Sequence, residues 1–334
     1  MAGMERSSGL GVAILGYGAI ADMHATALRA AGARLLVVAG PKQDQASEFA
    51  ARHGVESVVT DASRAIEAIG VDAVVIASPS PLHASQASAA LAAGRHVLVE
   101  IPLALTALDA ESLVAQATRA ERTLMVCHTL RYWQPFHEAR NAMEIAGWRP
   151  RNIVVRGLAR RRENVGWTGR QRSWTDDLLW HHGGHIVDMV LELLGEPVIA
   201  VAAEVGPVWE SSGLPMDYAI ALRTADGAIA SIALSYNARL GGTDYVVIGE
   251  PDTIVIAGAD VTSAEGPIVA GEDVGAVQER AVLAQDLDFL ECAKSGRKPI
   301  ADAASILPAM RVLQAIQDLV SSRDPVLADE RPAR

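Results

Sequence analysis

The sequence contains little cysteine and no long apolar run. Cys127 and Cys292 are the only two cysteines among 334 residues, so a disulfide framework is excluded and a reducing compartment is expected. No apolar stretch approaches the roughly 20 residues that a membrane-spanning helix needs, and the N-terminal residues MAGMERSSGLG lack the apolar centre of a secretory signal. The sequence therefore predicts a cytoplasmic protein with no membrane partner.

The chain also lacks an excess of positive charge. Its formal net charge is −11, which argues against nucleic acid as a partner. Arginine is nevertheless concentrated between residues 149 and 172, where eight arginines accompany a single acid, Glu163. Such a cluster forms either a solvated basic loop or a pocket for a multiply anionic small molecule, because guanidinium groups bind carboxylates through paired hydrogen bonds.

A glycine-rich turn near the N-terminus indicates a dinucleotide-binding site. The aliphatic run at 10–15 stops at the sequence GYGAIA, residues 16–21, and a helical pattern continues from 21 to 31. Strand, glycine turn and helix in this order form the G-x-G-x-x-G/A fingerprint, in which the pyrophosphate binds at the helix N-terminus. The expected cofactor contacts in this turn are Gly16, Tyr17, Gly18, Ala19 and Ile20.

The acid that usually holds the ribose of NAD is missing. It would follow the second strand, 35–39, about 20 residues beyond the glycines, but Gly40, Pro41 and Lys42 stand there and the first acid is Asp44. A lysine attracts the 2′-phosphate of NADP, which an acid would repel. We therefore expect Lys42 to contact NADP; NAD, with Lys42 as an ordinary surface residue, is the alternative.

The pattern of strands and helices divides the chain into two domains. Strands at 73–77, 97–99 and 124–128 alternate with helices at 83–93 and 109–121, which predicts an α/β, doubly wound Rossmann domain with about six parallel strands over residues 1–130. Residues 131–334 are expected to form an α+β domain with a large, mostly antiparallel sheet. Whether the last helices pack on the first domain is left open.

Three segments resemble the glucose–fructose oxidoreductase/inositol dehydrogenase/MocA (Gfo/Idh/MocA) family. They are VDAVVIASPSPLHASQASAALAAGRHVLVEIPL at 71–103, HTLRYWQP at 128–135 and DFLECAKSGRKPI at 288–300. The resemblance implies an NAD(P)-dependent oxidoreductase that forms a homodimer or homotetramer through one face of the second sheet. It also implies further cofactor contacts, mostly at the carboxyl ends of strands, namely Ser78, Pro79, His83, Glu100, Ile101 and His128.

The catalytic lysine of that family is absent from this chain. The family motif Glu-Lys-Pro becomes Glu100-Ile101-Pro102. In the family the lysine lies near the nicotinamide and serves the acid/base step, and an isoleucine side chain cannot move a proton. The resemblance therefore leaves this role unfilled at position 101.

Residues 170–188, RQRSWTDDLLWHHGGHIVD, hold the candidate replacement. A helix capped by Thr175 or Asp176 and running from about 176 to 194 would place His181 and His185 on one face, because they are four residues apart. A metal site that uses His181, His185 and Asp188 is one interpretation, a structural helix is the second, and an acid/base site is the third. The glutamate of an H-E-x-x-H motif is missing, and we favour the acid/base site without a metal.

The resemblance assigns roles to these residues. His185 matches the histidine of an Asp-x-x-x-His pair in the family, and His181 replaces the aspartate. Both departures match a subgroup that acts in aromatic catabolism and oxidises a ring-cleavage semialdehyde as its cyclic hemiacetal. His185 would then be the base, aided by His181 and Asp188, since a histidine near neutral pKa can deprotonate a hemiacetal hydroxyl. The residues expected to contact the carboxylates and flat ring of this substrate are Arg131, Arg162, Arg172, Trp174, Trp180 and His182.

Three other functions each fit part of the sequence. A sugar or polyol dehydrogenase of the same family would normally keep the lysine and the aspartate. A non-catalytic NADP-binding regulator would not need several histidines, and a metal-dependent hydrolase would contain bound metal. The semialdehyde dehydrogenase accounts for the histidines and the arginines together.

Overall fold

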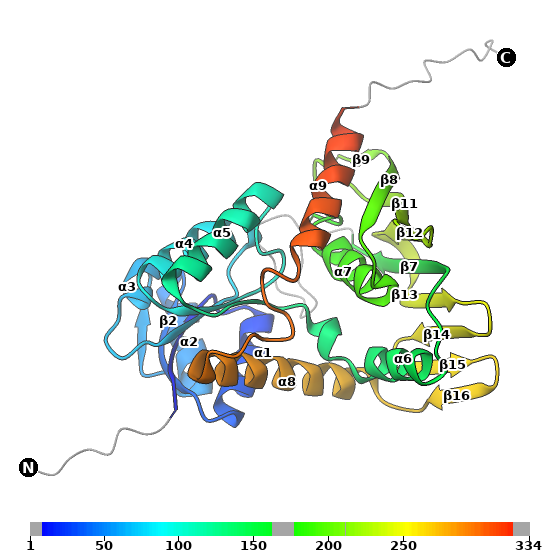
Figure 1. Cartoon of the computed structure of the whole chain (residues 1–334). Helices are drawn as coiled ribbons and strands as arrows, with labels where there is room; N and C mark the ends of the chain where they lie inside the picture. Colours follow the sequence, from blue (N-terminus) through cyan, green and yellow to red (C-terminus); the bar gives the residue numbers. More distant parts are fainter. Residues whose placement is uncertain (1–8, 162–176, 211, 323–334) are drawn as a thin grey trace, which may run out of the picture.

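The computed structural model describes residues 9–161, 177–210 and 212–322. Its first half is a parallel sheet flanked by helices (Figure 1). The strands are short, β-branched and buried; Val12–Leu15 and Ala73–Ile76 are almost completely inaccessible to solvent, which is expected when helices cover both faces of a parallel sheet. The elements of this half are β1 (Gly11–Leu15), α1 (Ala19–Ala30), β2 (Arg34–Ala39), α2 (Gln43–His53), β3 (Ser57–Val59), α3 (Ala62–Ile66), β4 (Ala73–Ile76), η1 (Ser80–Leu82), α4 (His83–Ala92), β5 (His96–Val99), α5 (Ala107–Ala120) and β6 (Leu124–Val126).

The six strands lie in the order β3-β2-β1-β4-β5-β6, and every neighbouring pair is parallel. The order reverses between β1 and β4, so the carboxyl ends of these two strands flank a crevice where sheets of this type bind ligands. The fold class expected for the first half of the sequence is confirmed, and the glycine turn after β1 opens into this crevice.

The second half is built on a large mixed sheet. Its eight strands lie in the order β16-β15-β14-β13-β7-β12-β11-β8, and among their pairings only β12 with β7 is parallel. This agrees with the mostly antiparallel sheet expected from the sequence. The elements are η2 (Thr129–Tyr132), α6 (Gln134–Ile145), β7 (Asn152–Arg160), α7 (His182–Leu194), β8 (Val198–Val205), β9 (Val208–Trp209), β10 (Leu214–Pro215), β11 (Asp217–Thr224), β12 (Ile229–Ser235), β13 (Asn237–Ile248), β14 (Thr253–Ala257), β15 (Asp260–Ser263), β16 (Gly266–Val269), α8 (Val274–Ser295) and α9 (Leu307–Ser321).

Among the described residues, helices cover one face of this sheet and leave the other open. Helix α7 contacts β7 and β12, α9 contacts β8, and α6 contacts β14 to β16. Side chains alternate along β11, where Tyr218 and Ile220 are buried while Ala219 and Ala221 are exposed. The exposed positions pair with Ala233 and Ser231 of β12, so the open face carries a flat stretch of small side chains.

The long helix α8 crosses back to the first half of the chain. It packs against α1 and η2, while α9 contacts α5, α7 and β8; Figure 1 shows α8 running beneath both halves. These two helices join the parallel sheet to the mixed sheet and bring residues near 286 next to the glycine-turn helix. None of the helices in the described ranges is both long and apolar enough to cross a membrane.

The histidine-bearing helix begins later than the sequence suggested. Helix α7 starts at His182 rather than near 176, and Thr175 and Asp176, the expected caps, lie outside the described residues. The carboxylate of Asp177 accepts hydrogen bonds from the backbone N–H groups of Leu179 (2.8 Å) and Trp180 (3.1 Å). This side chain stabilises a separate turn ahead of the helix, so the predicted start was wrong by about one and a half turns.

Candidate active site

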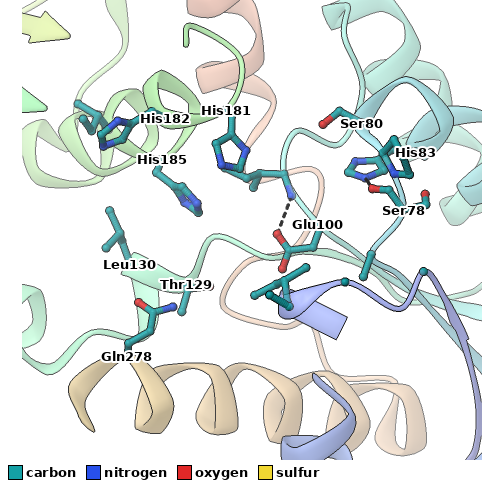
Figure 2. Close-up of a pocket in the computed structure, with 18 of the residues that line it drawn as sticks. Ser78, Ser80, His83, Glu100, Thr129, Leu130, His181, His182, His185 and Gln278 are labelled. Carbon is teal, nitrogen blue, oxygen red and sulfur yellow. Dashed lines mark hydrogen bonds between the residues drawn. The ribbon is translucent and has the colours of Figure 1, made fainter. Parts of the chain in front are cut away.

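A cavity of about 1400 Å³ lies between the two sheets. The first half contributes the glycine turn after β1 and the segments that follow β2, β4 and β5, whereas the second half contributes α7, β7 and part of β13. Figure 2 shows His181, His182 and His185 on one side of this pocket and Ser78, Ser80, His83 and Glu100 on the other. The pocket therefore brings the glycine-turn segment and the histidine segment together.

The glycine turn has the geometry of a phosphate-binding loop. Gly16 has a φ of 111°, which favours glycine, and a Cβ there would lie 2.3 Å from the carbonyl oxygen of Ala77. At Gly18 a Cβ would meet nothing within 4 Å, so a ligand can approach the backbone. Helix α1 begins at Ala19 without a side-chain cap, and its first N–H groups are free to bind an anion. These residues fit a dinucleotide.

The adenosine side of the pocket is shaped by Tyr17. A Cβ on Gly40 would lie 2.0 Å from Cε1 of Tyr17, and the hydroxyl of Tyr17 accepts a hydrogen bond from the backbone N–H of Lys42 at 3.2 Å. The tyrosine ring thus occupies the space that a side chain at position 40 would need. The acid that usually reaches the ribose from this position is excluded by packing as well as by sequence.

Two loops at the carboxyl ends of β4 and β5 are tied together by His83. Its Nδ1 lies 2.8 Å from the carbonyl oxygen of Pro102 and its Nε2 lies 2.8 Å from that of Ser78. The peptide bond between Ile101 and Pro102 is cis.

Of the expected cofactor contacts, all line the pocket except His128, whose Nδ1 instead lies 3.1 Å from a carboxylate oxygen of Asp188.

The three histidines of the 181–185 segment line the pocket, and two of them, His182 and His185, are held neutral by burial. The centroids of the His181 and His185 rings are 6.3 Å apart, and the His182 ring stacks on Tyr236 with a centroid distance of 6.0 Å. Burial lowers the pKa of His185 to about 3, helped by the nearby His128, and it lowers the pKa of His182 to about 4, helped by Arg161. Each neutral imidazole has a ring nitrogen that can accept a proton. The lowered pKa values make both rings weaker bases than the near-neutral histidine that the sequence led us to expect.

The ring of His185 has one nitrogen without a partner. Within the described residues, Nδ1 of His185 is buried and makes no hydrogen bond. The ring meets His128 edge-on, with centroids 5.8 Å apart. A buried polar atom without a partner indicates a functional or ligand-binding position, since most such atoms are satisfied in folded proteins.

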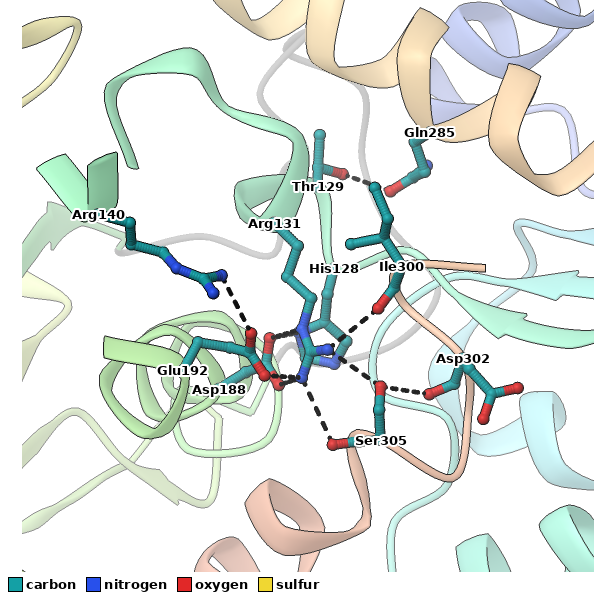
Figure 3. Close-up of polar contacts among 10 residues, drawn as sticks. All are labelled: His128, Thr129, Arg131, Arg140, Asp188, Glu192, Gln285, Ile300, Asp302 and Ser305. Carbon is teal, nitrogen blue, oxygen red and sulfur yellow. Dashed lines mark hydrogen bonds and ion pairs between the residues drawn. The ribbon is translucent and has the colours of Figure 1, made fainter. Parts of the chain in front are cut away.

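Asp188 and Arg131 lie behind the histidines, in a network of polar contacts outside the pocket (Figure 3). The guanidinium of Arg131 donates to Asp188 from Nε (2.8 Å) and Nη2 (2.6 Å), and it also donates to the carbonyl of Ile300 and the hydroxyl of Ser305. Burial alone would raise the pKa of Asp188, but His128 and Arg131 lower it well below its usual value. Arg131 is therefore not placed to bind a substrate carboxylate, and Asp188 is engaged with His128 rather than with His185.

Trp180 also differs from its expected role. Only 2% of it is exposed, and its indole N–H donates to the side-chain oxygen of Gln317 in α9. It packs in the core and does not line the pocket, so it cannot form a wall for a flat ring. Arg162, Arg172 and Trp174 lie outside the described residues.

The metal interpretation of the histidine helix is not supported by this geometry, because Asp188 faces the other way. Among the described residues, one group has metal-ligand spacing: His24, Glu100 and Cys127. In that group Nε2 of His24 lies 2.9 Å from a carboxylate oxygen of Glu100, the distance of a direct hydrogen bond. The sequence gives no sign of a role for His24, because its neighbours Glu100 and Asp286 are 76 and 262 residues away in the chain.

The fold and the pocket define a nucleotide-dependent oxidoreductase with a substrate domain. Residues 10–128 match the family model described as an oxidoreductase family with an NAD-binding Rossmann fold, and residues 139–274 match a model of bacterial oxidoreductase C-terminal domains. The chain belongs to the Gfo/Idh/MocA family of oxidoreductases, whose members use NAD or NADP.

Curated relatives and solved structures agree with this assignment. The chain is 35% identical to 4-carboxy-2-hydroxymuconate-6-semialdehyde dehydrogenase from Sphingobium sp. (strain NBRC 103272 / SYK-6), over 92% of this chain and 97% of that protein. It is 28% identical to an inositol 2-dehydrogenase from Streptomyces avermitilis, over 75% of each chain. The crystal structure of GenD2 from gentamicin A biosynthesis, in complex with NAD, has the same fold, with a TM-score of 0.82 and 21% identity over 96% of this chain and 97% of that one.

Proposed function

We propose that this enzyme oxidises 4-carboxy-2-hydroxymuconate-6-semialdehyde in its cyclic hemiacetal form, with NADP as the hydride acceptor, in the catabolism of aromatic compounds. One observation carries the proposal: the pocket presents three histidines, two of them held neutral by burial, together with Ile101 at the position of the family lysine. The relative of that name covers nearly the whole chain, which supports the same substrate. The inositol 2-dehydrogenase from Streptomyces avermitilis matches a smaller share of the chain at lower identity.

The chemistry of this substrate explains why a lysine is dispensable. The 2-hydroxyl and the 6-aldehyde close a six-membered ring, so the reacting carbon carries both a hydroxyl and a ring oxygen. Such a hydroxyl is more acidic than that of a polyol, and a neutral imidazole is a sufficient base. The product of oxidation is the lactone 2-pyrone-4,6-dicarboxylate.

His185 is proposed as the base. It lines the pocket, its buried Nδ1 makes no hydrogen bond to any described residue, and burial keeps the ring neutral in the free enzyme. It takes the hydroxyl proton while the carbon–hydrogen electron pair leaves as hydride. A dinucleotide held by the glycine turn would supply the hydride acceptor. His181 and His182 donate hydrogen bonds to the carboxylates of the substrate, a role that Arg131 cannot fill because Asp188 holds it.

The choice of NADP follows from the adenosine side of the pocket. Lys42 lines it, and the contact between Tyr17 and Gly40 leaves no room for a ribose-binding acid. An exposed ammonium at this position would attract a 2′-phosphate. These residues would hold NADP in preference to NAD.

We also propose that the enzyme is a homodimer or homotetramer that pairs through the open face of its large sheet. The exposed side chains on β11 and β12 include Ala219, Ala221, Ser231 and Ala233, which allow another flat sheet to pack closely. Val154 on the neighbouring strand β7 and Ile229 on β12 add apolar surface. An exposed face of this kind marks an interaction site.

The direct test mixes purified protein, NADP⁺ and freshly generated 4-carboxy-2-hydroxymuconate semialdehyde and follows NADPH by its absorbance. We expect stoichiometric NADPH and 2-pyrone-4,6-dicarboxylate, identified by chromatography. A parallel reaction with myo-inositol serves as the control and is expected to be silent. Turnover of inositol without turnover of the semialdehyde would assign the enzyme to the polyol dehydrogenases instead.

A further inference from the structure

A buried histidine outside the pocket connects both halves of the molecule to the candidate site. His24 lies on the inner face of α1 with no exposed surface. Its Nδ1 is 2.9 Å from a carboxylate oxygen of Asp286 on α8, and its Nε2 is 2.9 Å from one of Glu100, just after β5. Asp286 is completely buried, whereas Glu100 lines the pocket. The three side chains form a row that runs from the interior to the cavity.

The charges in this row favour an ionised Glu100. Burial alone would lower the pKa of His24, but Asp286 raises it well above its usual value. Burial alone would raise the pKa of Glu100, but the hydrogen bond and the charge of His24 lower it. Two carboxylates and one imidazolium leave one net negative charge, and only Glu100 presents it to the pocket. Gln285 supports the far end by donating to Asp286 at 3.3 Å.

This negative charge faces the proposed base. The charged or titratable groups near His185 include Glu100 across the pocket, His128 just after β6, His181 just before α7, and His182 and Asp188 on the same helix. Burial, His128 and His182 all disfavour the protonated ring, whereas Glu100 and Asp188 favour it, Glu100 more strongly. Glu100 stands beside the position of the family lysine, and it bears the opposite charge.

We propose that His24 is a positioning residue of the active site: held between Asp286 and Glu100, it fixes the Glu100 carboxylate at the pocket edge, where that charge stabilises the oxidised nicotinamide ring and the protonated His185. His24 and Glu100 would thus stabilise a positive charge before and after hydride transfer. Before transfer the charge is on the oxidised nicotinamide ring, and afterwards it is on His185. A cationic lysine at this place would disfavour the protonated form of a neighbouring histidine, whereas the Glu100 carboxylate favours it. The part that concerns His185 rests on the function proposed above, whereas the part that concerns the nicotinamide does not.

The experiment measures dissociation constants for NADP⁺ and NADPH by titration without substrate. The two forms differ by one positive charge on the nicotinamide ring, so their ratio reports the charge of Glu100. Glu100→Gln keeps the shape of the side chain but removes its charge. We expect it to raise the dissociation constant for NADP⁺ relative to that for NADPH by about tenfold. Cys127→Ala is the matched control, since its thiol lies 3.8 Å from His24 but is neutral because burial raises its pKa; it should leave the ratio unchanged.

His24→Gln tests the role of the histidine itself. Its side-chain amide can still donate to Glu100 but carries no charge, so the pKa of Glu100 should rise and the ratio should become dependent on pH. At high pH the variant should resemble the wild type, and as the pH falls through the raised pKa it should approach Glu100→Gln. A purely structural role would give a ratio that does not change with pH.

Each outcome decides the proposal. If His24→Gln does not fold, Glu100→Gln alone decides, because an unchanged ratio in that folded variant contradicts the proposal. If the ratio of the two dissociation constants changes as expected but the semialdehyde is not oxidised, the proposed role of His24 and Glu100 is supported and the proposed substrate is wrong. A pH-independent ratio in folded His24→Gln would show that the histidine does not control Glu100.

Discussion

Position 101 holds an isoleucine where the family has its catalytic lysine, so other ionisable residues around it must take over the acid/base step. Ile101 is buried, with only 2% of its surface exposed, and its Cδ1 would lie 4.0 Å from a Cβ added to Gly184 of α7. This is an ordinary van der Waals distance, so Ile101 packs close to the first turn of α7. With isoleucine in place of the family lysine at position 101, the proposed proton transfer depends on imidazole rings and on the carboxylate of Glu100.

A residue on the adenosine side provides the first prediction. Lys42→Ala should raise the dissociation constant for NADP⁺ about five- to tenfold and leave that for NAD⁺ almost unchanged, because an exposed charge–phosphate contact contributes roughly 1 kcal/mol. Fluorescence titration measures both constants. Lys294→Ala, an exposed residue outside the pocket lining, is the control, and an equal loss for both cofactors would contradict the assignment.

At the scale of elements, local patterns were predictable and long-range pairings were not. The glycine turn could be recognised because strand, turn and helix are contiguous, and its residues line the pocket as expected. The role expected of Arg131 depends on Asp188, 57 residues away, and nothing near Arg131 in the sequence indicates that partner. The start of α7 was misjudged because the Asp177 side chain caps a separate turn. His24 gave no signal, since its function depends on the docking of α8 against α1.

The pair of Arg131 and Asp188 joins η2 to α7 and provides the second prediction. Arg131→Met should lower the free energy of unfolding by about 3–5 kcal/mol, because it leaves a buried carboxylate without its partner. Arg140→Met is the matched control: Arg140 is half-exposed and lies 3.6 Å from Glu192, so its loss should cost less than about 1 kcal/mol. Urea denaturation measures both variants, and equal values would show that the buried pair is not a structural link.

At the scale of the whole molecule, pH dependence follows from the histidines. The pKa of His185 is lowered to about 3, so in the free enzyme the base stays neutral as the pH falls through the ordinary histidine range. The value of kcat/KM, which reports groups of the free enzyme, should therefore stay level from pH 8 down to about pH 5. A decline centred near pH 6.5 would contradict the buried, neutral state of this ring.

The open face of the large sheet provides a prediction about assembly. Ala221→Arg places a long charged side chain on the flat stretch, and it should convert the oligomer to a monomer of 35.2 kDa in sedimentation velocity. Ile69→Arg is the control, since Ile69 is completely exposed in the other half of the molecule. If both variants sediment like the wild type, subunits do not pair through this face.

The most direct test of the account is single-turnover oxidation of the semialdehyde by His185→Ala loaded with NADP⁺. We expect NADPH formation to slow by about 10²–10⁴-fold while the dissociation constant for NADP⁺ stays within about twofold of the wild type. Hydride transfer at the wild-type rate in this variant would show that His185 is not the base in the lysine-free pocket.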